Sequence, residues 1–233
     1  MGLTIHYRLS LPPEPDGLDE LRARWAVEAA RSLAKKMKRQ KQFAAVGPMR
    51  WDYESRKWNR EFYDFPVPGQ PNRFYDIEPF PEAGQLFEIQ PGLDCEPFWI
   101  GLCRYPKTEH AFERDFRVPR GPVWRLRGFS KTQYASLHGW EHFRRCHVAI
   151  VDFLAALRPL GFRVKISDEG CYWPHRSERN LREAVGMMNR LVAAAAGALK
   201  DADESGGVEA PIFAHPQFER LEAEGTNLLA KRP

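Results

Sequence analysis

The sequence predicts an α+β fold, in which a mixed or antiparallel sheet carries its helices on one face. Three observations predict it: an alternating strand pattern near the N-terminus, three long helical patterns, and the order strand, helix, strands, helix, strand, helix. Elements in that order fit a sheet with helices packed against it. A ferredoxin-like sandwich with an elaborated middle is the expected topology. The 233 residues suffice for one well-buried core.

The N-terminal segment predicts a strand followed by a helix. Residues 3–11 alternate between apolar and polar side chains, which is typical of a half-buried strand. Asp16 can cap the helix that follows, and we expect this helix to run to about Lys41. Its apolar stripe, at spacings of three and four residues, comprises Leu18, Leu21, Trp25, Ala29 and Leu33.

Residues 42–82 form an insertion in which aromatic residues and prolines sit among many charges, and no regular period persists. A structureless loop of that length is unusual inside a compact domain. We therefore expect the insertion to wrap the core, with short strands inside it. The functional alternative is a lid over a pocket.

The rest of the chain predicts the remaining strands and helices. Gly161 is expected to end the second helix, and Ser177 to cap the third, whose apolar stripe comprises Leu181, Ala184, Val185, Met188, Val192, Ala195 and Leu199. Strands are expected at 85–89, 97–104, 123–127 and 162–167, and helices at 139–160 and 177–200.

The chain is expected to fold as one domain over residues 1–203, followed by a linker and tail over 204–233. The small residues Ser205, Gly206 and Gly207 predict a flexible break. Beyond it, Ile212 and Phe218 belong to an apolar set that is large enough to dock back on the domain.

Composition favours a cytoplasmic protein without a cofactor. No apolar run approaches the roughly 20 residues that cross a bilayer, and residues 1–6 lack the features of a signal peptide. The net charge of +4 is too mild to imply nucleic acid without local clustering. None of the four cysteines has a metal-binding or redox spacing, so free thiols are expected.

Three histidines in residues 138–147 suggest a metal site, but a helical wheel argues against it. His147 lies at the centre of the apolar stripe of the predicted helix, whereas His142 lies roughly 140° away on the far face. His138 lies near His142. The three rings cannot share one ion on a straight helix, so no metal is expected.

His147 is instead expected to meet Asp168. From the Gly161 turn, thirteen helical residues lead back to His147 and about six strand residues lead forward to Asp168, both about 20 Å. A buried imidazole needs such a partner. Either the pair is structural, or Asp168 orients His147 as a general acid or base. In the second case Lys131 or Tyr134 would stabilise the developing charge.

Three segments resemble a family of uncharacterised bacterial proteins. They are Phe-Ser-Lys-Thr-Gln-Tyr-Ala-Ser at 129–136, Arg-Cys-His at 145–147, and Ser-Asp-Glu-Gly-Cys-Tyr-Trp at 167–173. The resemblance covers roughly residues 95–200. It implies a bacterial origin but carries no activity and no functional residue.

A second candidate surface lies on the first helix. Arg24, Arg31, Lys35 and Lys38 fall within roughly 60° of one another on the wheel. They could bind phosphates while aromatic residues of the insertion stack on unpaired bases. The alternative is a solvated face whose cations favour the helix C-terminus.

Two functions compete on these observations. The first is an accessory or interaction protein that contacts nucleic acid or a protein partner and does not bind membranes. It is favoured because motifs for phosphate loops, nucleophiles and paired carboxylates are absent from the sequence. The alternative is a small hydrolase or transferase that uses His147 and Asp168.

Overall fold

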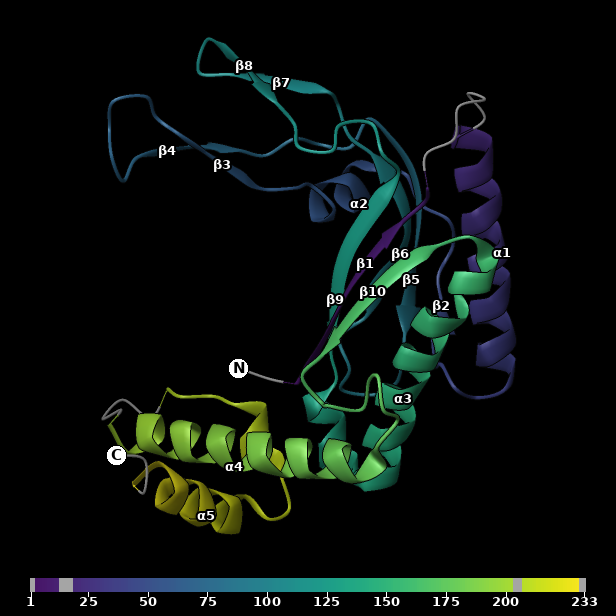
Figure 1. The fold of residues 1–233 in the computed structure, drawn as a ribbon. Coiled ribbons are helices and arrows are strands. Elements are labelled where there is room, and N and C mark those ends of the chain that lie inside the picture. Colours follow the sequence, from purple (N-terminus) through teal and green to yellow (C-terminus); the bar gives the residue numbers. More distant parts are fainter. Residues whose placement is uncertain (1–2, 13–18, 203–206, 231–233) are drawn as a thin grey trace.

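The computed structural model describes residues 3–12, 19–202 and 207–230, and it has an α+β fold (Figure 1). Its centre is a six-stranded sheet in the order β10-β1-β9-β6-β5-β2, and every neighbouring pair is antiparallel. The ferredoxin-like detail of the predicted topology stays a prediction. The strands are β1 (Thr4–Ser10), β2 (Ala45–Val46), β5 (Ala83–Gln90), β6 (Phe98–Arg104), β9 (Arg125–Lys131) and β10 (Arg163–Asp168).

Two helices cover one face of the sheet, which we call the helix face. They are α1 (Asp19–Arg39) and α3 (Trp140–Ala156), on the same side of the strands (Figure 1). On β1, Ile5, Tyr7 and Leu9 are buried in the core, whereas His6 and Arg8 are exposed. Because side chains of a strand alternate between faces, His6 and Arg8 lie on the opposite face, which we call the open face.

The apolar stripe predicted for the first helix is wrong in its first half, whereas Leu33 does pack against the core. Trp25 is 65% exposed and Leu21 is 39% exposed. Leu18 and the predicted cap Asp16 lie outside the described residues. The buried face of α1 comprises Ala23, Ala26, Val27, Ala30, Ala34 and Met37. Small alanine side chains let the helix approach the sheet closely, so the bulky residues face outward.

The second predicted helix and the strand after it are confirmed. α3 ends at Ala156, a 3-10 turn follows at Arg158–Leu160, and Gly161 adopts a φ of 92°. That left-handed conformation costs glycine little. The chain therefore reverses at Gly161 and returns along β10 beneath α3, as the spacing predicts.

The insertion at residues 42–82 forms short elements, as predicted, but only its first part, with Phe43, Val46 and Met49, packs against the core, while its later part projects from the sheet (Figure 1). Phe43 and Ile77 are buried, whereas Trp58, Phe62 and Phe74 are 74%, 61% and 57% exposed. Its short elements are β2, helix α2 (Tyr53–Trp58) and a hairpin of β3 (Tyr63–Pro66) and β4 (Phe74–Ile77). The hairpin projects from one end of the sheet toward the side of the open face (Figure 1).

A second hairpin, which the sequence did not predict, lies beside the first. It consists of β7 (Thr108–Ala111) and β8 (Arg114–Arg117). Aromatic rings join the two hairpins: the Phe65 and Phe116 centroids are 5.1 Å apart, and those of Tyr75 and Phe112 are 5.3 Å apart. These rings pack between the two hairpins and not in the main core. Their positions in the sequence therefore show no regular helical or strand spacing.

At the other end of the sheet, α4 (Glu178–Ala202) and α5 (Phe218–Ala230) form an arm. Ser177 caps α4 by accepting a hydrogen bond from the backbone N–H of Asn180 at 3.2 Å. The predicted stripe fits the first half of α4, where Leu181 and Val185 are buried, but Leu199 is 61% exposed. In the second half of α4, Ala193 and Ala196 pack with Ile212 of the tail. The buried face of the helix there is therefore different from the predicted one.

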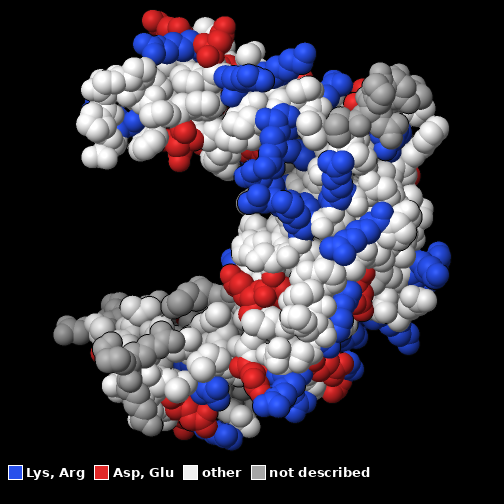
Figure 2. Space-filling view, in the orientation of Figure 1, with Lys and Arg blue, Asp and Glu red and all other residues white. Residues whose placement is uncertain are grey.

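The tail therefore docks back, but on α4 and not on the sheet. Residues 203–206, where the predicted linker begins, lie outside the described residues. The arm and the two hairpins extend toward the same side, so the molecule has the outline of a letter C with the open face in its hollow (Figures 1 and 2). Within the described ranges, no helix combines the length and apolar character that crossing a membrane requires.

Candidate functional site

His147 and Asp168 meet as the sequence predicts. The His147 Nε2 atom lies 3.0 Å from the Asp168 Oδ1 atom, and the Nδ1 atom lies 2.8 Å from the Thr132 hydroxyl. A carboxylate only accepts hydrogen bonds, so Nε2–H donates to Asp168 and Nδ1 can accept from Thr132. The side chains of His147 and Asp168 are both 0% exposed.

The Asp168 carboxylate also organises the turn that leads to α4. Oδ1 accepts the backbone N–H of Gly170 at 2.7 Å, and Oδ2 accepts those of Tyr172 and Trp173, both at 2.9 Å. Burial alone would raise the pKa of Asp168, but the hydrogen bond and charge of His147 and these backbone donors hold the pKa below its ordinary value. Each carboxylate oxygen therefore has two donors.

The surroundings of His147 favour the structural interpretation of the pair. The Phe143 ring lies against the imidazole with centroids 5.5 Å apart, and a β-carbon at Gly170 would collide with both the imidazole and Leu181 of α4. The pair thus joins α3, β10 and the start of α4. It has no exposed surface through which a substrate could reach it.

The predicted helpers of an acid–base His147 do not join it. Lys131 forms an ion pair with Glu96 at 3.0 Å, and it lies on the open face with the other outward residues of β9, across the sheet from α3. Among the described residues, Tyr134 makes no hydrogen bond or ring contact with His147. The described residues also contain no group of three or more potential ligands that could hold a metal ion.

The predicted stripe on α1 is accessible but lies on the far side of the sheet from the hollow. Arg24, Lys35 and Lys38 are exposed, whereas Arg31 is partly buried and donates to the Gly47 carbonyl at 3.1 Å. Figure 1 shows α1 on the outer side of the C. The aromatic residues of the insertion therefore do not line the same surface as this stripe.

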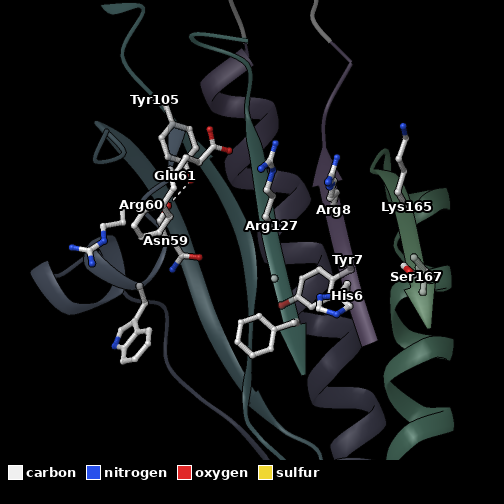
Figure 3. A pocket seen from close by; sticks show the side chains of 15 residues that line it. His6, Tyr7, Arg8, Asn59, Arg60, Glu61, Tyr105, Arg127, Lys165 and Ser167 are labelled. Carbon is white, nitrogen blue, oxygen red and sulfur yellow. Dashed lines mark hydrogen bonds between the residues drawn. The ribbon is translucent and has the colours of Figure 1, made fainter. Parts of the chain in front are cut away.

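A different cationic cluster lies on the open face. Arg8 of β1 pairs directly with Lys165 of β10 on one side and with Arg127 of β9 on the other. All three side chains are exposed. We call Arg8, Arg127 and Lys165 the cationic row. Figure 3 shows them side by side on adjacent strands, and Figure 2 shows Lys and Arg side chains gathered in the hollow.

No described acidic side chain forms an ion pair with the cationic row, and the neighbouring Glu61, whose pKa the charge of Arg127 helps to lower, is already paired with Arg125. Within the described part of the chain, no member of the cationic row forms a hydrogen bond or ion pair with another side chain. Like charges directly opposite each other destabilise a sheet, and three of them in register are therefore unfavourable for the unliganded protein. Such an arrangement is typical of a surface that receives an anion.

The cationic row opens into a cavity of about 670 Å³, which we call the first cavity (Figure 3). This volume is in the range of small-molecule and cofactor sites. Its floor is the open face of β1, β9 and β10, and its wall is residues 58–62 at the end of α2. Residues 58–62 belong to the insertion, so the insertion builds one side of the site.

A neighbouring cavity of about 610 Å³, which we call the second cavity, continues along the open face. Trp58, Arg127 and Phe129 line both cavities. The second cavity is also lined by Trp99, by Arg50 and by three glutamates, Glu54, Glu88 and Glu96. The two cavities together form a groove, and the acidic side chains gather in its second half.

A buried ion pair holds the wall against the sheet. Arg125 donates to Glu61 through Nε at 2.9 Å and through Nη2 at 2.6 Å, and both side chains are nearly inaccessible. The Tyr63 hydroxyl donates to Glu61, and the Arg125 guanidinium lies 4.4 Å from the centre of the Tyr105 ring. Burial opposes ionisation, but the bonds from Arg125 and Tyr63 lower the pKa of Glu61.

The sequence contained a signal for the cationic row that the prediction missed. Arg8, Arg127 and Lys165 each occupy a position that alternates with apolar residues in a predicted strand. Their outward orientation follows from that alternation. The pairing of these three residues across the sheet could not be derived, because it depends on the order of the strands. Arg8 and Lys165, for example, are 157 residues apart in the sequence.

Comparison with protein-family models, curated proteins and solved structures found no match to this chain. The resemblance to a family of uncharacterised bacterial proteins therefore stays a prediction. Its three segments do supply Thr132, His147 and Asp168, which meet in the buried network described above. The geometry of the open face is the basis for inferring a function.

Proposed function

We propose that this chain is a cytoplasmic, non-catalytic accessory protein that binds single-stranded nucleic acid along its open face. The cationic row is the observation that carries the proposal. Arg8, Arg127 and Lys165 stand in register without acidic partners among the described residues. A polyanionic backbone laid across β10, β1 and β9 would relieve their mutual repulsion and release its own counterions.

Exposed aromatic residues beside the cationic row favour a single strand over a duplex. Trp58 is 74% exposed and Phe129 is 52% exposed, and both line the two cavities. Aromatic side chains bind single strands by stacking on unpaired bases, and a positively charged groove follows the backbone. In a duplex the faces of the bases are already stacked on one another. The open face therefore offers the two features that single-strand binding requires.

The proposal moves the nucleic-acid surface from α1 to the hollow of the C. The sequence-based hypothesis combined the α1 stripe with aromatic residues of the insertion, but α1 lies on the outer side of the C, away from the hollow (Figure 1). The insertion instead contributes Trp58 and Phe62 beside the cationic row. The enzyme alternative has no such support, because the His147 side chain is fully buried against the turn before α4.

We expect replacement of Arg8 by glutamine to weaken the binding of every single-stranded sequence and to reduce its salt dependence. Each phosphate contact adds about 0.7 to the slope of log affinity against log salt for a single strand. The Arg8→Gln slope should therefore be smaller by about 0.7. Fluorescence anisotropy of a labelled oligonucleotide, titrated at several salt concentrations, measures both quantities.

The same variant should be slightly more stable than the unmodified protein without nucleic acid. Removing the middle charge of the cationic row relieves two cross-strand repulsions, worth a few tenths of a kcal/mol or more. Lys35→Gln on α1 is the matched control, because it removes one exposed cation from the outer surface. An equal loss of salt dependence in Lys35→Gln, or no salt-sensitive binding by the unmodified protein, would contradict the proposed function.

A further inference from the structure

The two halves of the groove differ in chemistry in a way that phosphate binding does not explain. The first cavity holds the cationic row, whereas the second cavity has three glutamates beside Trp58, Trp99 and Phe129. Carboxylates repel a phosphate backbone, and the three glutamates outnumber Arg50 and Arg127 in the second cavity, so this cavity suits a polyanion less well than the first cavity does. An aromatic wall with hydrogen-bond acceptors instead suits a flat ring that carries amino groups.

Two of the three carboxylates are available to a ligand. Glu96 is held by Lys131 at 3.0 Å, whereas the carboxylates of Glu54 and Glu88 have no hydrogen bond or ion pair with any described residue. Glu54 is exposed on α2, whereas Glu88 is half-buried on the sheet. Glu88 of β5 stands directly opposite Trp99 of β6. An acceptor without a partner therefore lies next to an aromatic ring in the same cavity.

We propose that the second cavity holds an unpaired nucleobase and that Glu88 accepts a hydrogen bond from the amino group of that base. This inference rests on the proposed function and adds a base preference to it. Cytosine presents an amino donor where thymine and uracil present a carbonyl acceptor, and glutamate is the side chain that accepts from this donor. The groove should favour amino-bearing bases, of which cytosine gives the clearest comparison.

The residues that line both cavities explain how one nucleic-acid strand can occupy both. Arg127 and Phe129 are separated by Gly128 on β9, and all three line the first and the second cavity. A backbone phosphate on Arg127 therefore lies at the boundary of the cavities. The attached base can turn away from the cationic row, stack on Phe129 or Trp58, and point its amino edge toward Glu88.

The test compares the binding of short oligocytidine and oligothymidine strands by fluorescence anisotropy. Both strands carry pyrimidines and the same backbone charge, so their affinity ratio isolates the edge of the base. We expect the unmodified protein to bind oligocytidine about fivefold or more tightly, the lower end of the discrimination that a good base contact gives. Glu88→Gln should bring the ratio close to one, because a glutamine amide can also donate to the thymine carbonyl.

Two further variants separate this effect from charge and from stacking. Glu82→Gln makes the same charge change at an exposed position just before β5 that lines neither cavity, and it should keep the preference. Trp58→Leu should weaken both strands by about tenfold with an unchanged ratio, because stacking tolerates any base.

The outcomes distinguish this inference from the function on which it rests. Equal binding of the two strands by the unmodified protein, or a preference that survives in Glu88→Gln, would overturn the base contact and leave the proposed function standing. Failure of the unmodified protein to bind either strand at low salt would overturn both. A preference that is lost in Glu88→Gln and kept in Glu82→Gln supports the inference.

Discussion

Replacement of Glu61 by glutamine is expected to lower the free energy of unfolding by about 3–5 kcal/mol, the usual result of removing one partner of a buried ion pair. Glu61 and Arg125 have only 4% and 6% of their side chains exposed, and two hydrogen bonds join them. The variant would leave the Arg125 guanidinium charged and uncompensated inside the protein. Urea unfolding measures the change.

An exposed ion pair on the same segment provides the control. Arg60 and Glu78 lie 3.2 Å apart, but their side chains are 31% and 43% exposed. Glu78→Gln should cost no more than about 1 kcal/mol, because solvent screens such a pair. If Glu61→Gln is as mild as Glu78→Gln, then the ion pair does not anchor the wall of the first cavity in the way that the geometry indicates.

Asp168→Asn should destabilise the protein by about 3 kcal/mol or more. Each oxygen of Asp168 accepts two hydrogen bonds, and an amide must turn its NH2 group toward two of those donors. Hydrogen bonds to a charged acceptor contribute about 1.5–3 kcal/mol each. Urea unfolding near neutral pH measures this loss, and hydrogen exchange should show it first in residues 168–173.

The exposed pair of His110 and Asp115, whose atoms lie 2.9 Å apart, is the matched control. Asp115→Asn should change stability by no more than about 0.5 kcal/mol, as is usual for an exposed site. A loss of similar size in both variants would show that burial of the Asp168 network is not what makes it stabilising.

Low pH should lower the free energy of unfolding by protonating the carboxylates of Asp168 and Glu61. The folded-state pKa values of Asp168 and Glu61 are both lowered. A carboxyl group whose pKa is lowered by folding stabilises the folded protein at pH values above its unfolded-state pKa, which is about 4. That stabilisation is lost as the pH falls through the folded-state pKa. Unfolding measured from about pH 6 downward should therefore show a steeper loss in the unmodified protein than in Asp168→Asn.

The sequence predicted the elements and contacts that depend on local periodicity. The contact between His147 and Asp168 could be predicted by counting residues from the Gly161 turn, because a helix and a strand have fixed rises per residue. The buried face of α1 was not predicted, because alanines pack closest to the sheet while Trp25 stays outside. Bulky side chains dominate a hydrophobic pattern even where they do not form the contact.

The proposed site was beyond sequence reasoning for a topological reason. The cationic row brings together residues from β1, β9 and β10, and the wall of the first cavity comes from the insertion. Arg8, Arg127 and Lys165 look like ordinary surface residues in their own strands. They become a candidate site only after the sheet order places them opposite one another.

The location of the nucleic acid is tested most directly by photocrosslinking. A single strand that carries an iodinated cytosine, irradiated in complex with the protein, should attach to aromatic residues that stack on its bases. We expect mass spectrometry to find the attachment at Trp58, Trp99 or Phe129 of the open face. Attachment at Trp25, which is 65% exposed on α1, would place the strand on the outer surface and contradict this account.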